Sequence, residues 1–188
     1  MKNKYSLPTN GGLIPDSAPR DIIHRYERIN TNIFPTENEG VSYVADLIIS
    51  SINEYNEYAC YRDEWDADRP FVLGLTTGRT PIGLYRELVE RYKKGEVSFK
   101  NVAVFSLDEF YPINPHEIQS RNFRIHEEFI NHINILPENV HIPDGNIPVS
   151  EISQYCKDYD LKASNIDLMI MGMGEEGQIG FNEAGSYP

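Results

Sequence analysis

The sequence has few cysteines, few basic residues and no long apolar run. Its 188 residues include only two cysteines, Cys60 and Cys156, which lie far apart and form no Cys-x-x-Cys pattern. This usage is typical of a reduced, cytoplasmic protein without a disulfide framework. The N-terminus has no apolar segment of the signal-peptide type, and no run approaches the length needed to span a membrane. We therefore expect a soluble, cytoplasmic protein.

The scarcity of positive charge also excludes classes of partner. Lysine and arginine number 17 against 29 acidic residues, which gives a net charge of −12. This charge argues against nucleic acid or an anionic membrane as the main partner, although a small anionic substrate fits if local positive groups offset the field. The histidines show no metal-ligand spacing, so we expect no metal site.

Two parts of the chain differ in character. Residues 1–30 are interrupted by prolines and glycines and form an N-terminal extension, which we expect to be peripheral or to contact another subunit of a homo-oligomer. Residues 31–188 have the length and apolar content of one domain, or of most of one.

Short apolar segments predict the strands of that domain. Phe71-Val-Leu-Gly-Leu75 and Val102-Ala-Val-Phe105 are apolar on both faces, and residues 140–142 and 166–171 predict two further strands. Helical patterns lie between them. The first follows a capping box at Thr36, and the second is expected to have Thr80 as N-cap and Pro81 as its first residue.

Two later helices complete the alternation. Ser120 is expected to cap a helix with Phe123, Phe129, Ile130 and Ile133 on its apolar face, and another helix is expected over about 150–162. Alternating buried strands and amphipathic helices predict an α/β fold with a doubly wound, mainly parallel, Rossmann-like sheet. The chain stops at Pro188, soon after the last predicted strand, so we also expect the domain to be truncated at its C-terminal end.

Polar loops follow three of the predicted strands and should therefore meet at one edge of the sheet. The first loop contains hydroxyl residues and a glycine before a helix N-terminus, an arrangement that binds phosphate, although it is also found in ordinary turns. Its arginine either forms a bidentate pair with the phosphate or lies on the surface. The residues of this loop are Thr76, Thr77, Gly78, Arg79 and Thr80.

The other two loops carry carboxylates. Asp108 and Glu109 end a buried strand, where one of them can act as a base next to a carbonyl, the alternative being helix capping or a salt bridge. Glu109 is also expected to bind substrate. The closing loop contains Glu176, Gln178 and Glu183, and any proton relay through Gln178 is limited to hydrogen bonding because an amide does not titrate.

The combined motifs resemble one family. Leu-x-Thr-Gly-x-Thr-Pro, Leu-Asp-Glu-Phe-Tyr, Ser-x-x-Phe and Gly-x-Gly-x-x-Gly-x-Ile-x-Phe-Asn-Glu are similar, in order and spacing, to the glucosamine-6-phosphate deaminase/isomerase family. The resemblance implies conversion of glucosamine 6-phosphate to fructose 6-phosphate and ammonia without an organic cofactor. It also implies that Thr76 to Thr80 hold the phosphate and that Asp108 moves a proton between C1 and C2.

The closing loop departs from the family pattern. The family has Asp-Gly-His there, and its histidine, supported by that aspartate and a glutamate, opens the sugar ring. This chain has Glu176 and Gln178 in those places and retains only Glu183. Three functions are therefore considered: the deaminase/isomerase, a catalytically impaired sugar-phosphate-binding or regulatory module, and a hydrolase like the related 6-phosphogluconolactonases.

Overall fold

The computed structural model describes residues 31–58, 69–175 and 177–180, so the predicted N-terminal extension lies outside the described residues. These residues form a sheet of four strands in the order β3-β2-β1-β4, and every pair is parallel. The strands are β1 (Phe71–Leu75), β2 (Val102–Ser106), β3 (Val140–His141) and β4 (Leu168–Met169). The predicted parallel α/β fold is confirmed. The strand order reverses between β1 and β4.

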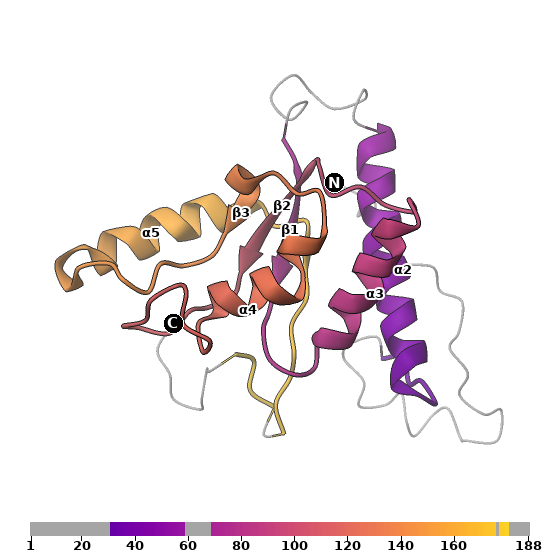
Figure 1. Cartoon of the computed structure of the whole chain (residues 1–188), viewed down its shortest axis with the longest axis horizontal. Helices are drawn as coiled ribbons and strands as arrows, with labels where there is room; N and C mark the ends of the chain where they lie inside the picture. The colour runs from indigo at the N-terminus through magenta and orange to yellow at the C-terminus, as the bar shows by residue number, and fades with distance from the viewer. Residues whose placement is uncertain (1–30, 59–68, 176, 181–188) are drawn as a thin grey trace.

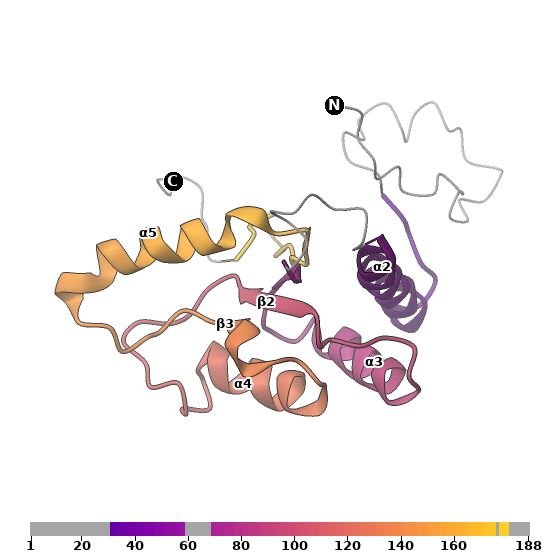
Figure 2. The ribbon, with the colours of Figure 1, turned by 90° about the horizontal axis from the view of Figure 1, so that it is seen from above.

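Helices lie on both faces of this sheet (Figures 1 and 2). One face carries α2 (Glu37–Glu57), α3 (Ile82–Lys93) and α4 (Arg121–Glu128), and the other carries α5 (Ile152–Lys162). None of the described helices has the length and apolar content needed to cross a bilayer.

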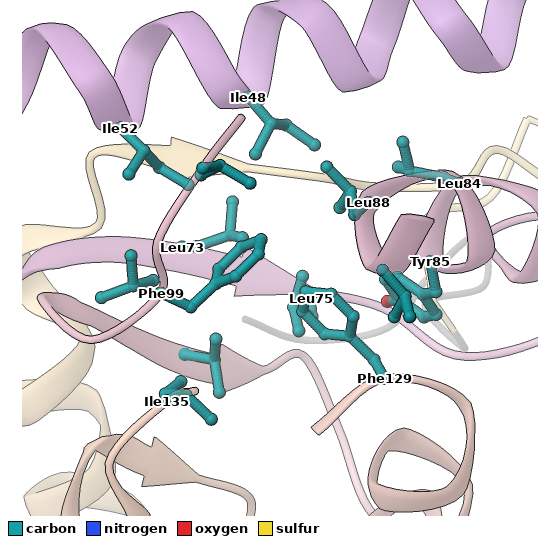
Figure 3. Packing of buried hydrophobic residues seen from close by; sticks show 14 of the residues in the cluster. Ile48, Ile52, Leu73, Leu75, Leu84, Tyr85, Leu88, Phe99, Phe129 and Ile135 are labelled. Carbon is teal, nitrogen blue, oxygen red and sulfur yellow. The ribbon is translucent and has the colours of Figure 1, made fainter. Parts of the chain in front are cut away.

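The main core lies between β1, β2 and the first three helices (Figure 3). Alternate residues of a strand point to the same side of the sheet, so Phe71, Leu73 and Leu75 of β1 all face this core. Leu73 is fully buried there. Three aromatic rings complete the cluster. Phe99 meets Phe129 edge-on at 5.3 Å between ring centroids, and Tyr85 stacks on Phe129 at 5.2 Å.

The second face has a smaller core and hydrogen bonds between α5 and the sheet. Val72, Ala103 and Phe105 are buried there, with Tyr159 of α5 packed against them. The Tyr159 hydroxyl donates to the carbonyl oxygen of Ser106 at 2.8 Å and to that of His141 at 3.1 Å. This side chain therefore fastens α5 to the carboxyl ends of β2 and β3.

The start of α3 differs from the prediction. Thr80 is not the N-cap: that position belongs to Pro81, whose carbonyl accepts the backbone N–H of Tyr85 at 2.9 Å, and the helix begins at Ile82. Thr36 does cap α2, as predicted, by accepting from the backbone N–H of Glu39 at 3.3 Å.

The predicted cap of α4 is confirmed, but its apolar face is not. Ser120 accepts the backbone N–H of Phe123 at 3.3 Å. The helix ends at Glu128, so Phe129 and the apolar residues after it pack from a 3₁₀ turn, and the buried residue of the helix itself is Ile125. A helical periodicity that continues across a tight turn cannot show where the helix stops.

The last strand is shorter and more exposed than predicted. The ladder between β1 and β4 contains the pairs Leu73↔Leu168 and Gly74↔Met169, and both β4 residues are only partly buried. Gly74 makes this close pairing feasible, because a Cβ there would lie 1.9 Å from the sulfur of Met169.

Asp167 joins β1 to the segment before β4, and removing its carboxylate should destabilise the sheet. It accepts two hydrogen bonds from Arg69, at 2.8 and 2.9 Å, and one from the backbone N–H of Val72 at 2.8 Å. We expect Asp167→Ala to lower the free energy of unfolding by about 1–3 kcal/mol, since it leaves that N–H without its acceptor. Urea denaturation measures this change. Asp158→Ala is the control, because Asp158 is exposed and its hydrogen bond among the described residues is with Gln154 of the same helix. Equal losses in the two variants would contradict the role of Asp167.

Candidate functional site

The candidate site is the carboxyl edge of the sheet, where the strand order reverses. In open parallel sheets, ligands bind outside the carboxyl ends of the strands at such a reversal. Thr77 and Asp108 each lie two residues beyond the paired residues Leu75 and Ser106, so they leave the same edge on neighbouring strands. The backbone N–H of Leu107 still donates to the carbonyl of Leu75 at 2.9 Å. The two predicted loops therefore start side by side.

The segment after β4 returns to the same place. The backbone N–H of Ile170 donates to the carbonyl of Gly74 at 2.9 Å, and the chain then passes through residues 171–180. A Cβ on Gly180 would lie 3.3 Å from Leu107, the residue before Asp108. Figure 1 shows this yellow segment at the same lower edge as the β1–α3 connection. Three polar loops thus meet around the end of β2.

The first loop is held in shape by Tyr85 of α3. The Tyr85 hydroxyl donates a hydrogen bond to the backbone carbonyl of Thr76, and the ring is fully buried. Burial, assisted by the charge of Glu128, raises the pKa of Tyr85 far above its usual value, so the phenol remains a neutral donor. Gly78 follows with φ of +112°, a backbone conformation that L side chains rarely adopt.

The N-terminus of α3 faces this loop and has no side-chain cap. Its N-cap is Pro81, which has no side-chain acceptor, whereas Thr36 and Ser120 cap α2 and α4. The backbone N–H groups of a first turn, together with the helix dipole, can bind an anion. In α3 the N–H of Ile82 donates to the carbonyl of Arg79 at 3.4 Å, so the following N–H groups are the candidates. Thr76 and Thr77 are partly buried beside it.

Arg79 lies at the rim of the loop. Its side chain is exposed and lines a groove of about 640 Å³ between α2 and α3, opposite Glu37. Among the described residues it forms no ion pair, so the guanidinium has the freedom to turn towards an anion. Its role as a phosphate clamp stays a prediction.

Asp108 is a partly buried carboxylate at this edge of the sheet. Its side chain is 26% exposed, and Ser106 fixes its turn by donating from Oγ to the Asp108 carbonyl at 3.1 Å. Burial raises the pKa of Asp108 most strongly, Arg121 lowers it and the charge of Glu109 raises it again. A carboxyl with a raised pKa is a stronger base when ionised than an exposed aspartate.

Glu109, its neighbour, is engaged by protein groups. Its carboxylate accepts from the Ser120 hydroxyl at 2.8 Å and from the backbone N–H groups of Arg121 and Asn122 at 2.9 and 3.0 Å. It also accepts from the N–H of Phe110 at 2.8 Å. These bonds correspond to the helix-capping alternative: Glu109 joins the Asp108 turn to the start of α4. Its predicted contact with substrate is not tested by this geometry.

Gln178 lies in a short hairpin formed by the closing loop. The Gly174 N–H donates to the Gln178 carbonyl at 2.8 Å, and Met173 pairs with Ile179 as an antiparallel bridge. The Gln178 side chain packs on Gly174, where a Cβ would lie 2.3 Å from its Nε2. Glu176 and Glu183, the other two predicted residues of this loop, lie outside the described residues.

The sequence analysis missed two residues of this edge. Arg121 lies next to Asp108, with 3.4 Å between Nε and Oδ1, and Tyr85 holds the Thr76 carbonyl. The only available signal was local: Arg121 follows the predicted cap Ser120, and Tyr85 lies in the helix predicted to begin at Pro81. Neither pattern shows which loop the side chain will reach.

No group of three or more His, Cys, Asp or Glu in the described ranges is arranged to hold a metal ion. A groove of about 420 Å³ lies between α4 and β3, lined by His126 and Val140 among others, away from the three loops. The site is therefore located by the convergence of loops at the strand ends.

Comparison with known proteins identifies the family. Residues 44–180 match the glucosamine-6-phosphate isomerases/6-phosphogluconolactonase family. The chain belongs to this family. The relatives include a glucosamine-6-phosphate isomerase of Candida albicans, 40% identical over 82% of this chain, and a glucosamine-6-phosphate deaminase of Halothermothrix orenii, 48% identical over 60% of it.

Solved structures agree with this family assignment. A monomeric glucosamine-6-phosphate deaminase superposes with a TM-score of 0.69 at 29% identity, covering 81% of this chain and 58% of that one. A 6-phosphogluconolactonase from Thermotoga maritima gives a TM-score of 0.54 at 24% identity over 73% of this chain and 59% of its own, a likeness of fold alone. The chain spans about half the length of the curated relatives it matches: 58% of the Candida protein and 47% of the Halothermothrix protein.

Proposed function

We propose that this protein is an amino-sugar-phosphate isomerase/deaminase that converts glucosamine 6-phosphate to fructose 6-phosphate and ammonia. The observation that carries the proposal is the position of Asp108, a partly buried carboxylate that follows β2 next to the strand whose loop leads into α3, in a chain 40–48% identical to proteins of that name. The likeness to lactonase structures is one of fold and does not favour hydrolysis of a lactone.

Asp108 is assigned the proton transfer. In the opened sugar, its carboxylate removes the proton at C2, the electron pair forms the C1–C2 double bond, and the aldehyde oxygen takes up a proton from the ammonium group, which gives an enolamine. Return of the proton to C1 leaves an imine at C2, which water hydrolyses to the ketone with loss of ammonia. One carboxyl group can serve both steps because it carries the proton between adjacent carbons.

The loop from Thr76 to Thr80 is assigned the phosphate. The N-terminus of α3 supplies backbone N–H groups, the threonines supply hydroxyl donors, and Arg79 supplies a positive charge. A local cluster of this kind is needed because the chain as a whole carries a net charge of −12, which opposes an anionic substrate.

The phosphate assignment predicts a loss of affinity when the loop backbone is changed. Gly78→Val places a branched side chain at φ of +112°, which displaces the neighbouring N–H groups, so the dissociation constant for glucosamine 6-phosphate should rise at least tenfold (about 1.4 kcal/mol). Thr80→Ala should weaken binding less. Titration calorimetry measures both.

Gly95→Val is the matched control for this experiment. Gly95 also has positive φ, +77°, and also faces open space, but it lies just beyond the other end of α3. It should therefore cost similar stability without changing affinity. Equal affinities in all three folded variants would exclude the loop as the anion site.

The reaction also needs a residue with a ring-opening role. We assign it to the closing loop, with Gln178 in the place of an acid/base group and with Glu176 and Glu183 as its carboxylates. The second candidate function, a sugar-phosphate-binding or regulatory module, is favoured by one observation: an amide cannot exchange a proton near neutral pH. An ammonia-release assay with glucosamine 6-phosphate separates the two, because the module would bind the sugar phosphate and release no ammonia.

The setting we propose for the reaction is the cytoplasm. Its support is the cysteine usage, since Cys156 is a free, exposed thiol. Assembly into a homo-oligomer stays a prediction.

A further inference from the structure

Arg121, at the first residue of α4, places its charge between two residues of the Asp108 turn. Its Nε lies 3.4 Å from Oδ1 of Asp108, and its guanidinium carbon lies 4.4 Å from the ring centroid of Phe110. The Arg121 side chain is only 14% exposed. A guanidinium over an aromatic face and beside a carboxylate has two attractive partners in a poorly solvated place.

The backbone on both sides of this pair is also fixed. Glu109 accepts from the Arg121 backbone N–H at 2.9 Å, and the fully buried Ser120 donates to the same carboxylate at 2.8 Å. Glu109 and Asp108 are adjacent in sequence. The helix that carries the guanidinium and the turn that carries the carboxylate are therefore locked together, and the distance between them does not depend on long flexible side chains alone.

We propose that Arg121 is a positioning residue that holds the Asp108 carboxylate ionised and oriented for proton transfer. This inference rests on the proposed function, since it gives Arg121 a part in the same reaction. Arg121 need not touch the sugar: it acts through Asp108.

The physical need for such a residue follows from the surroundings of Asp108. Burial and the negative charge of Glu109 both raise the pKa of the Asp108 carboxyl, and Arg121 opposes them. Among the described residues, these are the charged groups that act on it. A base must be ionised to accept a proton, so activity rises with pH through the pKa of this group. Without Arg121 the same rise should occur at higher pH.

The test compares Arg121→Gln with the wild-type chain in a pH profile of kcat/KM for ammonia release from glucosamine 6-phosphate. At pH values below the pKa of Asp108, on the acid limb of the profile, kcat/KM of Arg121→Gln should be roughly tenfold lower than that of the wild type. An opposite charge this close to a carboxyl changes its ionisation constant by at least that factor. At high pH, where Asp108 is ionised in both proteins, the difference should be smaller. Arg121→Lys should restore much of the loss, since it keeps the charge and loses the planar stack on Phe110.

Arg124→Gln is the matched control on the same helix. Arg124 is 46% exposed and pairs with Glu128 at 3.8 Å, one turn farther along α4. It should leave the acid limb where it is in the wild type. A loss in Arg121→Gln that is equal at every pH, or a shift of the same size in Arg124→Gln, would overturn the proposal.

A second measurement does not depend on turnover. Carbon-13 carboxyl NMR of the full chain follows the titration of Asp108, whose signal is assigned by its loss in Asp108→Asn. The midpoint should move to higher pH in Arg121→Gln, and an unchanged midpoint would overturn the role of Arg121. A moved midpoint in a protein that releases no ammonia would support the electrostatic pairing and overturn the proposed activity, so the two failures are distinguishable.

Discussion

Asp108→Asn is expected to lower the rate of ammonia release roughly 10²–10⁴-fold while leaving the fold intact. The amide has nearly the same shape as the carboxyl but cannot accept the proton from C2. The Ser106 bond to the Asp108 carbonyl is a main-chain contact and survives the change. Ammonia release at saturating glucosamine 6-phosphate measures the loss, and binding of the sugar phosphate should persist because the phosphate loop is unaltered.

The same substitution should raise thermal stability at neutral pH. The pKa of Asp108 is higher in the folded protein than in the unfolded chain, mainly because of burial. Its stabilising contribution is therefore fully present below the unfolded pKa and is lost as pH rises through the folded one. A neutral amide is not charged at pH 7 and so avoids the free-energy cost of burying a carboxylate. The unfolding temperature at pH 7 should therefore be higher than that of the wild type, whereas the exposed control Asp158→Asn should not change it.

Full deaminase activity in Asp108→Asn would show that another group is the base.

Gln178→His is expected to raise ammonia release by up to roughly 10²–10⁴-fold, the usual worth of a positioned acid/base group. An imidazole titrates near neutral pH and can pass a proton from the hydroxyl group on C1 of the closed sugar to the ring oxygen, which leaves C1 as the carbonyl forms; an amide cannot. The hairpin can accommodate the ring, because Gly174 has no side chain facing position 178. The gain should be larger for kcat than for binding of the sugar phosphate.

Two controls separate this chemistry from a change in the loop. Gln178→Asn keeps an amide and should bring no gain. Adding Gly174→Ala to Gln178→His should erase the gain, since a Cβ at 174 lies 2.3 to 2.7 Å from the present Gln178 side-chain atoms. A wild type that already turns over fast and is not improved by histidine would show that ring opening belongs to another residue. A protein that binds the sugar phosphate and stays silent with histidine would favour the binding module.

Local patterns in the sequence predicted the layered fold well. Strands that are apolar on both faces require cover on both sides, which is why residues 71–75 and 102–105 predicted a parallel sheet between helices. The caps at Thr36 and Ser120 were predicted because a hydroxyl at an N-cap bonds a backbone group only three residues away. The start of α3 was wrong by one residue, since a threonine before a proline resembles a cap whether or not its side chain bonds the helix.

The candidate site shows which contacts the sequence alone does not predict. The order of motifs placed Thr77 and Asp108 after buried strands, and parallel pairing then required both to leave the same edge, because parallel strands all end on one side. Only the tertiary structure determined which groups surround them: Arg121 beside Asp108, Glu109 on the first turn of α4, and Tyr85 beneath the Thr76 carbonyl. These contacts join residues 9 to 13 positions apart through helix direction and the path of a loop. Neither is encoded by a local pattern, because each depends on how whole elements pack.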